Sequence, residues 1–425
     1  MKLYNTLSQK IEPFRPQGDA VAVYVCGITP YDTTHLGHAF TYTSADVLIR
    51  YLEHKGHPVR YVQNVTDIDD DILRRAKKVG ENWRKLGDHW TTYFIRDMQA
   101  LNVRPPDFFP RATDVITEIV QAVEQLIAAG VAYESGGSVF FEVKAWPEYG
   151  KLSRLPRIKM LPIANERGNN PDDPRKRAPL DFVLWQAQVP GEPAWDSPWG
   201  SGRPGWHIEC STMATHFLGE TIDIHSGGGD LVFPHHESEI AQTEPVNGRR
   251  PYARFWMHMA MVGHEGEKMS KSLGNLVMVR DLLKSWSPDA LRLYMGSHHY
   301  RRPWTHDGKA LAKAEELAGK LRTAATIGGG RGTYFHLSQL PIEFDQAMDQ
   351  DLDTPAALKS LEAMADETLF AVRAGRQVKA AQNTLRAVCR IFGLRLDAPG
   401  PEERVQAGWD KHQLRFSEER KPPGE

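Results

Sequence analysis

The 425-residue sequence is poor in cysteine, in long apolar runs and in excess charge of either sign. Its three cysteines, Cys26, Cys210 and Cys389, are too few and too far apart to form a framework of disulfide bonds. No stretch approaches the roughly 18 consecutive apolar residues of a membrane-spanning helix, and the first residues lack the apolar core of a secretion signal. Lysine and arginine number 52 and aspartate and glutamate 54, so a protein that is basic throughout is excluded. These absences predict a cytoplasmic globular enzyme without membrane segments.

The first apolar run predicts the start of an α/β unit. Residues 20–26 are apolar and β-branched, residues 44–56 have the pattern of a helix that ends at a glycine, and residues 59–65 again resemble a strand. The loop over residues 27–39 therefore joins the carboxyl end of a strand to a helix, which is the usual place for a ligand in an open parallel sheet. Further strands are predicted at DFVLW, TIDIH and FWMHMAMV.

Changes in pattern divide the chain into a catalytic part, a helical part and a tail. Residues 1–285 predict one α/β domain with an insertion at about residues 100–200. Within it, residues 155–179 are basic and rich in turn-forming residues, which favours a surface loop. Residues 286–395 predict a helical bundle. Residues 396–425, with four prolines and three glycines, predict a poorly ordered tail.

The segment HLGH carries two histidines three residues apart where the first loop meets its helix. His35 and His38 can face one bound phosphate, and the helix N-terminus adds unpaired backbone N–H groups. Gly37 between them would let a ligand approach the backbone closely. The alternative is an ordinary surface loop with two solvated histidines.

The segment KMSKS lies in a polar loop, residues 264–275, after the strand FWMHMAMV. Lys268, Ser270 and Lys271 can close over a polyphosphate and neutralise the charge that develops on pyrophosphate as it leaves. Taken alone, the segment could be a flexible basic turn. Together, HLGH and KMSKS are similar to the two signatures that mark the ATP site of class I aminoacyl-tRNA synthetases.

A third group of residues has the chemistry of a metal site. Cys26, Cys210, His235 and Glu239 offer two thiolates, an imidazole and a carboxylate, a set of donors that suits zinc. His235 and Glu239 are four residues apart and share one face of a helix. No short CxxC spacing accompanies them, so Cys26 and Cys210 could instead be buried apolar residues. His236 and Glu237 compete with His235 for the role of ligand.

Several segments of the chain resemble the cysteinyl-tRNA synthetases, from about residue 3 to about residue 391. They are YVCGITPYDTTHLGHA, YVQNVTDIDDDI, PGEPAWDSPWGSGRPGWHIECSTM, DIH, DLVFPHHESEIAQ and EKMSKSLGN. The resemblance implies a Rossmann-type catalytic domain with a connective insertion, a stem-contact region around KMSKS and a helical bundle. It also implies ATP with Mg²⁺ and L-cysteine as substrates, the acceptor stem of tRNA(Cys) as partner, and a monomeric chain.

The resemblance also implies roles for individual residues. One zinc ion would be held by Cys26, Cys210, His235 and Glu239 and would bind the thiolate of the substrate cysteine, which a serine hydroxyl cannot imitate. The remaining expected site residues fall into three groups: catalytic His35, His38, Lys268 and Lys271; ATP-binding Gly37 and Ser270 together with those four; and cysteine-binding Cys26, Gly27, Thr66, Trp206 and Asp230.

The sequence departs from the family pattern at three places, and no full anticodon-binding domain is expected after the bundle. Phe40 stands where an arginine is common, and Ser226 and Gly229 alter the usual HGGGSD segment. NWRKLGD, TPYDTTHLGHA and ERGNNP resemble instead the mycothiol-pathway cysteine ligase, which joins activated cysteine to an amino-sugar, glucosaminyl-inositol, through an amide. Glu239 favours the tRNA enzyme.

Two further points concern binding to tRNA and the alternative of a protein without catalytic activity. If tRNA is the acceptor, the basic residues 154–177 and the pair Arg301 and Arg302 are the expected phosphate contacts, although a solvated charged loop would have the same composition. A third hypothesis, a binding module that uses a synthetase fold without catalysis, is disfavoured because HLGH and KMSKS are both intact.

Overall fold

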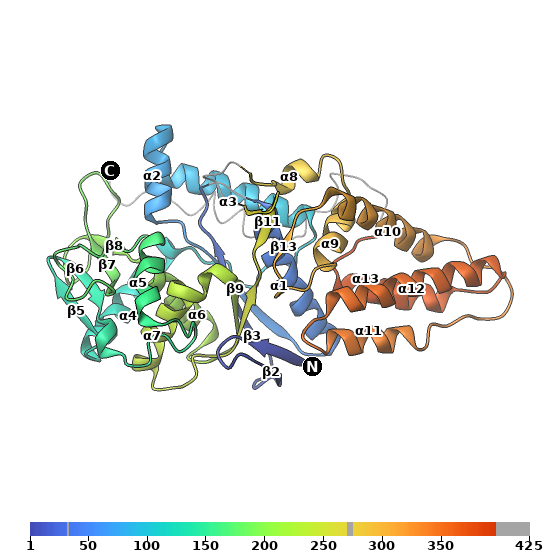
Figure 1. Cartoon of the computed structure of the whole chain (residues 1–425), viewed down its shortest axis with the longest axis horizontal. Coiled ribbons are helices and arrows are strands. Elements are labelled where there is room, and N and C mark those ends of the chain that lie inside the picture. The colour runs from blue at the N-terminus through green and yellow to red at the C-terminus, as the bar shows by residue number, and fades with distance from the viewer. Residues whose placement is uncertain (32–33, 270–274, 397–425) are drawn as a thin grey trace.

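The computed structural model describes residues 1–31, 34–269 and 275–396. Figure 1 shows an elongated molecule with the insertion at one end, the strands β3 (Val21–Ile28), β9 (Ile222–Gly228), β11 (Val262–His264) and β13 (Trp304–Thr305) near the middle and a group of long helices at the other end. A two-stranded hairpin, β1 (Lys2–Asn5) and β2 (Lys10–Pro13), lies near the middle. Within the described residues, no helix combines the length and the apolarity needed to cross a bilayer.

A four-stranded parallel sheet forms the centre of the catalytic part. Its strands are β3 (Val21–Ile28), β4 (Val59–Val65), β9 (Ile222–Gly228) and β10 (Ala253–Met259), in the spatial order β10-β9-β3-β4. Helix α1 (Leu36–His54) connects β3 to β4. The strands are nearly continuous runs of buried residues, as expected for a parallel sheet covered on both faces. The chain leaves β3 toward β4 on one side and reaches β9 on the other, so a crevice opens at the carboxyl ends of β3 and β9. The predicted Rossmann-type fold is confirmed.

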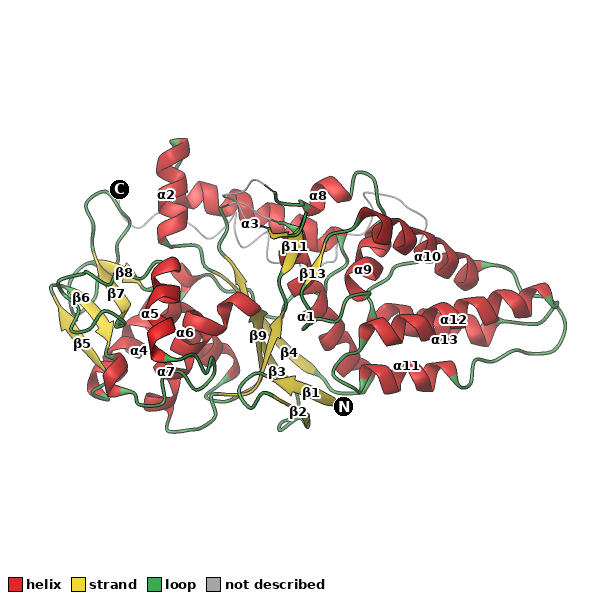
Figure 2. Ribbon diagram, in the orientation of Figure 1, coloured by secondary structure: helices red, strands yellow, loops and turns green. Residues whose placement is uncertain are grey.

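The insertion builds a second, antiparallel sheet. Its strands β5 (Ala132–Ser135), β6 (Ser138–Phe141), β7 (Phe182–Ala187) and β8 (Gly202–Pro204) lie in that order. The segment DFVLW belongs to this sheet through β7, and not to the parallel sheet. Helices surround the two sheets (Figure 2): α2 (Asp70–Val79), α3 (Trp83–Ala100), α4 (Ile116–Ala128), α6 (Trp206–Leu218) and α7 (Glu237–Asn247).

The expectation of a surface loop over residues 155–179 was wrong for its first half. Residues Arg157–Glu166 form helix α5, which buries Met160 and Ala164. These two residues are four apart and share one face of the helix, so they pack inward together. The charged residues around them and Pro162 inside the helix hide this pattern in the sequence.

A small sheet leads from the catalytic part into the bundle. Strands β11 (Val262–His264), β12 (Glu267–Lys268) and β13 (Trp304–Thr305) form this sheet, and α8 (Val279–Leu282) follows the first two. The bundle contains the four predicted helices and one that the sequence analysis missed, α11: α9 (Pro288–Gly296), α10 (Gly308–Thr326), α11 (Leu340–Met348), α12 (Thr354–Arg373) and α13 (Lys379–Ile391). Buried Phe344 and Met348, four residues apart, fix α11 against its neighbours.

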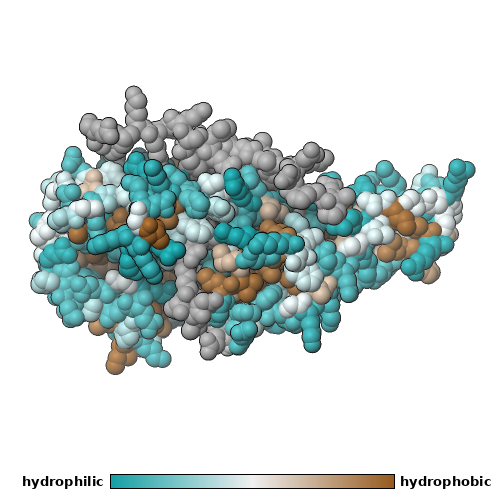
Figure 3. All heavy atoms as spheres, turned by 90° about the horizontal axis from the view of Figure 1, so that it is seen from above, coloured by the Kyte–Doolittle hydropathy of each residue, from teal (hydrophilic) through white to brown (hydrophobic). Residues whose placement is uncertain are grey.

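The surface is mostly hydrophilic on the face that Figure 3 shows, with separate apolar areas, the broadest of them near the centre of the view. The most exposed large apolar side chains lie on different elements, which explains their scatter. Ile158 lies on α5, Phe370 on α12 and Tyr334 on the loop before α11. Scattered exposed apolar residues are normal for a globular protein and do not define a docking face.

A buried ion pair joins the catalytic part to the bundle. Asp46 on α1 pairs with Arg292 on α9, and both side chains are about 1% exposed. Asp46 also accepts a hydrogen bond from Arg50 at 2.8 Å, and Arg292 donates one to the carbonyl of Leu101 at 2.8 Å. Burial alone would raise the pKa of Asp46, but Arg50 and Arg292 outweigh it and hold the pKa below its ordinary value.

We expect Arg292→Met to destabilise the protein by about 3 kcal/mol, because Asp46 would keep a buried charge with only Arg50 and the backbone N–H of Arg104 to compensate it. Urea unfolding measures the loss. Exposed Arg302, replaced in the same way, should change stability by less than about 0.5 kcal/mol. Since the pKa of Asp46 is lowered on folding, its contribution should persist above the ordinary carboxyl pKa of about 3.9 and disappear as the pH falls below it. Equal losses in both variants, or a loss in Arg292→Met that is independent of pH, would contradict this account.

Candidate active site

A pocket of about 1120 Å³ opens at the carboxyl ends of the parallel strands. Gly27 in β3, Thr66 after β4, Gly228 in β9 and Met259 in β10 all line it. The place agrees with the general rule for open α/β sheets, in which ligands bind where the strand order changes direction. Residues of the insertion form the opposite wall.

The HLGH segment lies in this pocket at the N-terminus of α1. The rings of His35 and His38 stack with centroids 3.7 Å apart. His35 also caps the helix, because its Nδ1 accepts hydrogen bonds from the backbone N–H groups of Gly37 at 3.1 Å and His38 at 3.4 Å. This role requires Nδ1 to be unprotonated. A Cβ on Gly37 would lie 2.9 Å from the His35 ring, so glycine is needed there to leave the ring in place.

Backbone hydrogen bonds tie the HLGH segment to the chain that follows KMSKS. The Leu36 N–H donates to the carbonyl of Val277 at 2.8 Å, and the Val279 N–H donates to the carbonyl of Thr34 at 3.0 Å. Buried Met269 lines the pocket beside Gly37. The structure therefore places Met269 and the described residues that follow KMSKS beside HLGH.

Of the three predicted site residues in KMSKS, the structure describes only Lys268. Lys268 is the last residue of β12, and its backbone pairs with Gly263 of β11. Ser270 and Lys271 lie outside the described residues, as do residues 397–425 of the predicted tail.

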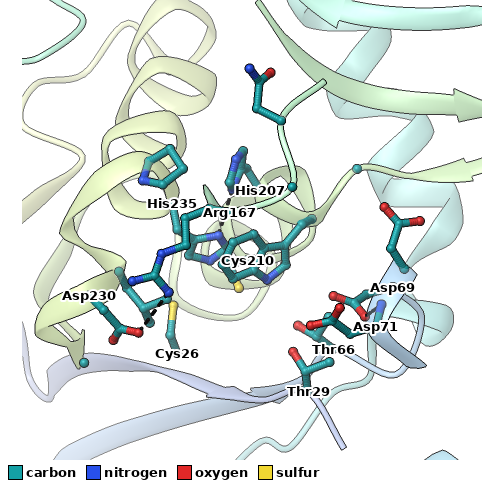
Figure 4. A pocket seen from close by; sticks show the side chains of 18 of the residues that line it. Cys26, Thr29, Thr66, Asp69, Asp71, Arg167, His207, Cys210, Asp230 and His235 are labelled. Atoms are coloured by element: carbon teal, nitrogen blue, oxygen red, sulfur yellow. Dashed lines mark hydrogen bonds and ion pairs between the residues drawn. The ribbon is translucent and has the colours of Figure 1, made fainter. Parts of the chain in front are cut away.

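The four predicted metal ligands meet at the base of the pocket. Cys26, Cys210, His235 and Glu239, here called the four-residue cluster, are buried, and each offers a ligand atom within 4.8 Å of the others. Figure 4 shows Cys26, Cys210 and His235 converging from different elements. Glu239 Oε1 lies 3.6 Å from Cys26 Sγ and 3.3 Å from His235 Nε2.

Burial shapes the protonation of this cluster. It raises the pKa of the Cys26 thiol and of the Glu239 carboxyl, and it lowers the pKa of His235. Each shift favours the neutral form. A divalent cation would reverse this preference for the acids and would be held by anionic donors, which is the chemistry of a metal site.

A second set of buried groups overlaps the first. Cys26, His225, His236 and Glu239 also bring their ligand atoms within 4.8 Å of one another. His225 Nε2 lies 2.8 Å from Glu239 Oε2, and His236 Nε2 lies 3.2 Å from Cys26 Sγ. Of the two competing residues named above, His236 is therefore beside the cluster. Glu237 points away and accepts hydrogen bonds from the backbone of Leu152 and Ser153.

Outer histidines hold the inner ones, and sequence reasoning missed them. His258 Nε2 lies 2.7 Å from His236 Nδ1, and His207 Nδ1 lies 2.9 Å from His235 Nδ1. Burial lowers the pKa of His207, His225 and His258 to about 3, so all three are neutral in this state. The only signals in the sequence were that His225 ends the predicted strand TIDIH, that His258 lies within FWMHMAMV and that His207 follows Trp206.

The predicted cysteine-binding residues surround the cluster. A Cβ on Gly27 would lie 1.5 Å from the carbonyl oxygen of Asn64, so only glycine lets β3 approach β4 this closely beside Cys26. Thr66 is buried and accepts a hydrogen bond from Asn64 at 3.3 Å. The Trp206 ring lies 4.4 Å from that of His235.

Asp230 lies beyond the end of β9 and forms an ion pair with Arg167. Asp230 Oδ2 is 3.2 Å from Arg167 Nη1. Arg167 follows helix α5, so a residue that the sequence analysis assigned to an RNA-contacting loop lies instead in the pocket.

The three departures from the family pattern have structural explanations. Phe40 is buried and packs edge to face on Trp304, with ring centroids 5.3 Å apart. Ser226 is buried and donates to the sulfur of Met259 at 3.4 Å. A Cβ on Gly229 would lie 3.1 Å from the carbonyl oxygen of Met259, so a side chain there would be tight.

Comparison with known families identifies this arrangement. Residues 13–316 match the family described as tRNA synthetases class I (C) catalytic domain. The chain belongs to this family of class I synthetases. Solved structures agree at the level of the fold. A methionyl-tRNA synthetase of Mycobacterium tuberculosis in complex with methionyl-adenylate has a TM-score of 0.62 at 17% identity, over 89% of this synthetase chain and 90% of its own.

Two curated relatives of this synthetase are much closer in sequence. A protein named cysteine–tRNA ligase from Dehalococcoides mccartyi is 43% identical over 96% of this chain and 89% of its own. A protein named L-cysteine:1D-myo-inositol 2-amino-2-deoxy-alpha-D-glucopyranoside ligase from Thermomonospora curvata is 43% identical over 91% of this chain and 92% of its own. The predicted resemblance to the cysteinyl-tRNA synthetases and to the related ligase is confirmed.

We expect Gly37→Ala to separate stability from activity in this synthetase. The new Cβ would displace the His35 ring and remove a cap worth about 1 kcal/mol, while alanine favours the helix by a similar amount. Stability should stay within about 0.5 kcal/mol. ATP–pyrophosphate exchange should fall at least about tenfold.

Gly319→Ala is the matched control, because Gly319 lies in α10 with open space around it. It should gain up to about 1 kcal/mol in urea unfolding and leave exchange unchanged. Normal exchange in Gly37→Ala would show that the placement of His35 does not matter.

Proposed function

We propose that this chain is a cysteine–tRNA ligase. It would use ATP with Mg²⁺ to convert L-cysteine to cysteinyl-adenylate, release pyrophosphate and transfer the cysteinyl group to tRNA(Cys). The observation that carries the proposal is the four-residue cluster of thiols, imidazole and carboxylate at the base of the pocket that also holds HLGH. The curated relatives named cysteine–tRNA ligase support it. As a protein of translation, the chain would act in the cytoplasm.

The four-residue cluster fits zinc. Two sulfur donors, one nitrogen donor and one carboxylate, all buried, suit a borderline-soft cation that prefers tetrahedral coordination. Zinc bound there would supply affinity for a substrate thiolate that a hydroxyl lacks. Cys26, Cys210, His235 and Glu239 would be its ligands, and His207 and His225 would orient the inner donors through the contacts described above.

The other predicted residues would divide the remaining work. Gly27, Thr66, Trp206 and Asp230 would enclose the cysteine, whose ammonium group needs a carboxylate partner such as Asp230. His35, Gly37 and His38 would receive the phosphates of ATP at the N-terminus of α1. Lys268, Ser270 and Lys271 would neutralise the charge that develops on the leaving pyrophosphate.

The acceptor would be bound mainly by the bundle side of the molecule. In this proposal residues 1–285 carry activation, and residues 286–395 contact the acceptor stem. Arg301 is bound to Asp351 and stacks on Tyr4, with its guanidinium 4.3 Å from the ring centroid, so it is committed to the fold. Arg302 is exposed and is the better phosphate contact of the pair.

We expect cysteine to drive ATP–pyrophosphate exchange and serine to fail. Discrimination against serine should exceed about a hundredfold, because a metal–thiolate contact has no equivalent for a hydroxyl. Exchange measured with each amino acid in turn tests the proposed activation directly. Equal rates with serine and cysteine would refute it.

We expect about one zinc ion per chain in the purified protein, because the two overlapping donor sets share Cys26 and Glu239 and can therefore hold only one ion at a time. Cys210→Ser should lose most of the metal and bind cysteine poorly, since one of four donors is replaced by a weak ligand. Cys389→Ser is the control, because Cys389 is buried on α13 in the bundle. Elemental analysis of the three proteins decides the point, and full zinc content in Cys210→Ser would contradict the assignment.

The second candidate function is an amide ligase that joins activated cysteine to an amino-sugar. The relative from Thermomonospora curvata, which is named as such a ligase and is similar over 91% of this chain, favours it. Both functions share the activation step. They differ in the bond that joins cysteine to its acceptor, which is an ester on tRNA and an amide on the amino-sugar.

We expect labelled cysteine to be retained on tRNA through an ester that mild alkali releases quickly. An amide with glucosaminyl-inositol would resist the same treatment. Transfer to tRNA should also weaken steeply with salt, because phosphate contacts release counterions. Purified protein, ATP and labelled cysteine should be incubated with each acceptor separately; a base-stable product formed without RNA would favour the second candidate.

A further inference from the structure

Arg167, a charged residue of the insertion, lies in the pocket, and the proposed function assigns no residue to the carboxylate of the substrate cysteine. Arg167 follows α5, and Figure 4 shows its side chain reaching into the pocket toward Asp230, on the side where Cys26 and Cys210 are drawn. Arg167 Nη1 and Asp230 Oδ2 are 3.2 Å apart, with side chains 30% and 29% exposed. The pair is therefore open to a ligand that enters the pocket.

Both partners are held by structure outside the pair. A Cβ on Gly228 would lie 2.6 Å from Asp230 Oδ1, so the Asp230 carboxylate lies back over the end of β9 in space that only glycine leaves open. Helix α5, which Arg167 directly follows, packs against residues Val232–His236, which include His235. The ion pair is thus anchored on two sides to the elements that build the four-residue cluster.

The pair also lies near the thiols along the sheet. Strands β3 and β9 are parallel neighbours, and Val25 lies opposite Ser226. Cys26 is the next residue of β3, and Asp230 is four residues beyond Ser226. A small molecule with its thiol at Cys26 and Cys210 can therefore place its other end at this pair.

Most other acidic side chains of the pocket are engaged elsewhere. Asp70 pairs with Arg203, Asp71 with Arg74 and Asp173 with Arg175. Asp69 caps helix α2 by accepting hydrogen bonds from two backbone N–H groups, and its pKa is raised to about 6, chiefly by burial. Among these, only Asp230 has its cation supplied by the residue that ends the helix packed against Val232–His236.

We propose that Arg167 binds the α-carboxylate of the substrate amino acid while Asp230 binds its α-ammonium group. In the empty pocket the two side chains neutralise each other. An amino acid carries the same two charges on adjacent atoms, so it can enter between them and replace one ion pair by two. The inference rests on the proposed function, since it deepens the recognition of cysteine at that same site.

This arrangement makes the pocket selective for ligands that carry both charges. A thiol with only an ammonium group would take Asp230 and leave the Arg167 guanidinium without its partner. A thiol with only a carboxylate would leave Asp230 without its partner. Each of these ligands breaks the Arg167–Asp230 ion pair and provides a new partner for only one of the two side chains. The zwitterionic amino acid provides a partner for both.

Three ligands of matched size test the proposal: L-cysteine, cysteamine, which lacks the carboxylate, and 3-mercaptopropionate, which lacks the ammonium group. Isothermal titration calorimetry on the full metal-loaded chain gives their affinities without any need for turnover. Arg167→Ala should weaken cysteine and 3-mercaptopropionate about tenfold, as for the loss of a hydrogen bond to a charged group. Cysteamine should bind equally well or better. Arg167→Lys should restore part of the loss.

Asp230→Asn should give the opposite pattern, weakening cysteine and cysteamine but not 3-mercaptopropionate. Arg249→Ala removes an exposed arginine that forms an ion pair with Glu220 outside the pocket; it is the control and should change none of the affinities. In exchange assays Arg167→Ala should raise the KM for cysteine about tenfold and lower kcat less, as expected for a group that binds the ground state.

The outcomes separate the inference from the proposed function. If Arg167→Ala weakens all three ligands equally, Arg167 only supports the fold of the pocket, and if it weakens none, Arg167 does not contact the substrate; either result overturns the inference. If the wild-type chain binds cysteine with the predicted pattern of variants but shows no exchange, the inference stands and the proposed activation fails.

Discussion

The burial of two thiols, an imidazole and a carboxylate within a few ångströms of one another is the constraint on which the rest of the pocket depends. In an apolar interior such groups favour their neutral forms, and only a bound cation makes an anionic set stable there. The surrounding structure reflects this demand. Outer histidines fix the inner ones, α5 covers the cluster from the insertion, and two glycines leave room where strand ends would otherwise be crowded.

The sequence identified the residues that bear chemistry better than it identified their surroundings. HLGH, Cys26, Cys210, His235 and Glu239 could be found because short motifs and donor chemistry are local properties. The parallel sheet could be predicted because buried strands are continuous apolar runs. The overlap of two possible ligand sets around Cys26 and Glu239 could not, because β3 meets β9 and α7, which follow it by about two hundred residues in the chain.

Arg167 and α11 show the other limit of the sequence. Arg167 stands in a run of charged and turn-forming residues, and composition alone assigns such a run to the solvent. Its place in the pocket follows from two small buried contacts of α5, Met160 and Ala164, which carry little periodic signal. Helix α11 is equally short, and its two buried residues acquire meaning only when the neighbouring helices are present. In both cases contacts with residues distant in the sequence determine the structure, and the local sequence pattern does not reveal these contacts.

The close approach of β3 and β4 at Gly27 has a consequence for how this chain can evolve. The backbone fixes the position of Cys26. Strand β3 is irregular between Val25 and Ile28, and the space between Gly27 and Asn64 admits no side chain. Residues on packed helix faces can be replaced by others of similar volume, and each replacement then lowers stability only slightly. At Gly27 no gradual path exists, so the helical bundle can change in sequence while the strand that holds Cys26 stays fixed.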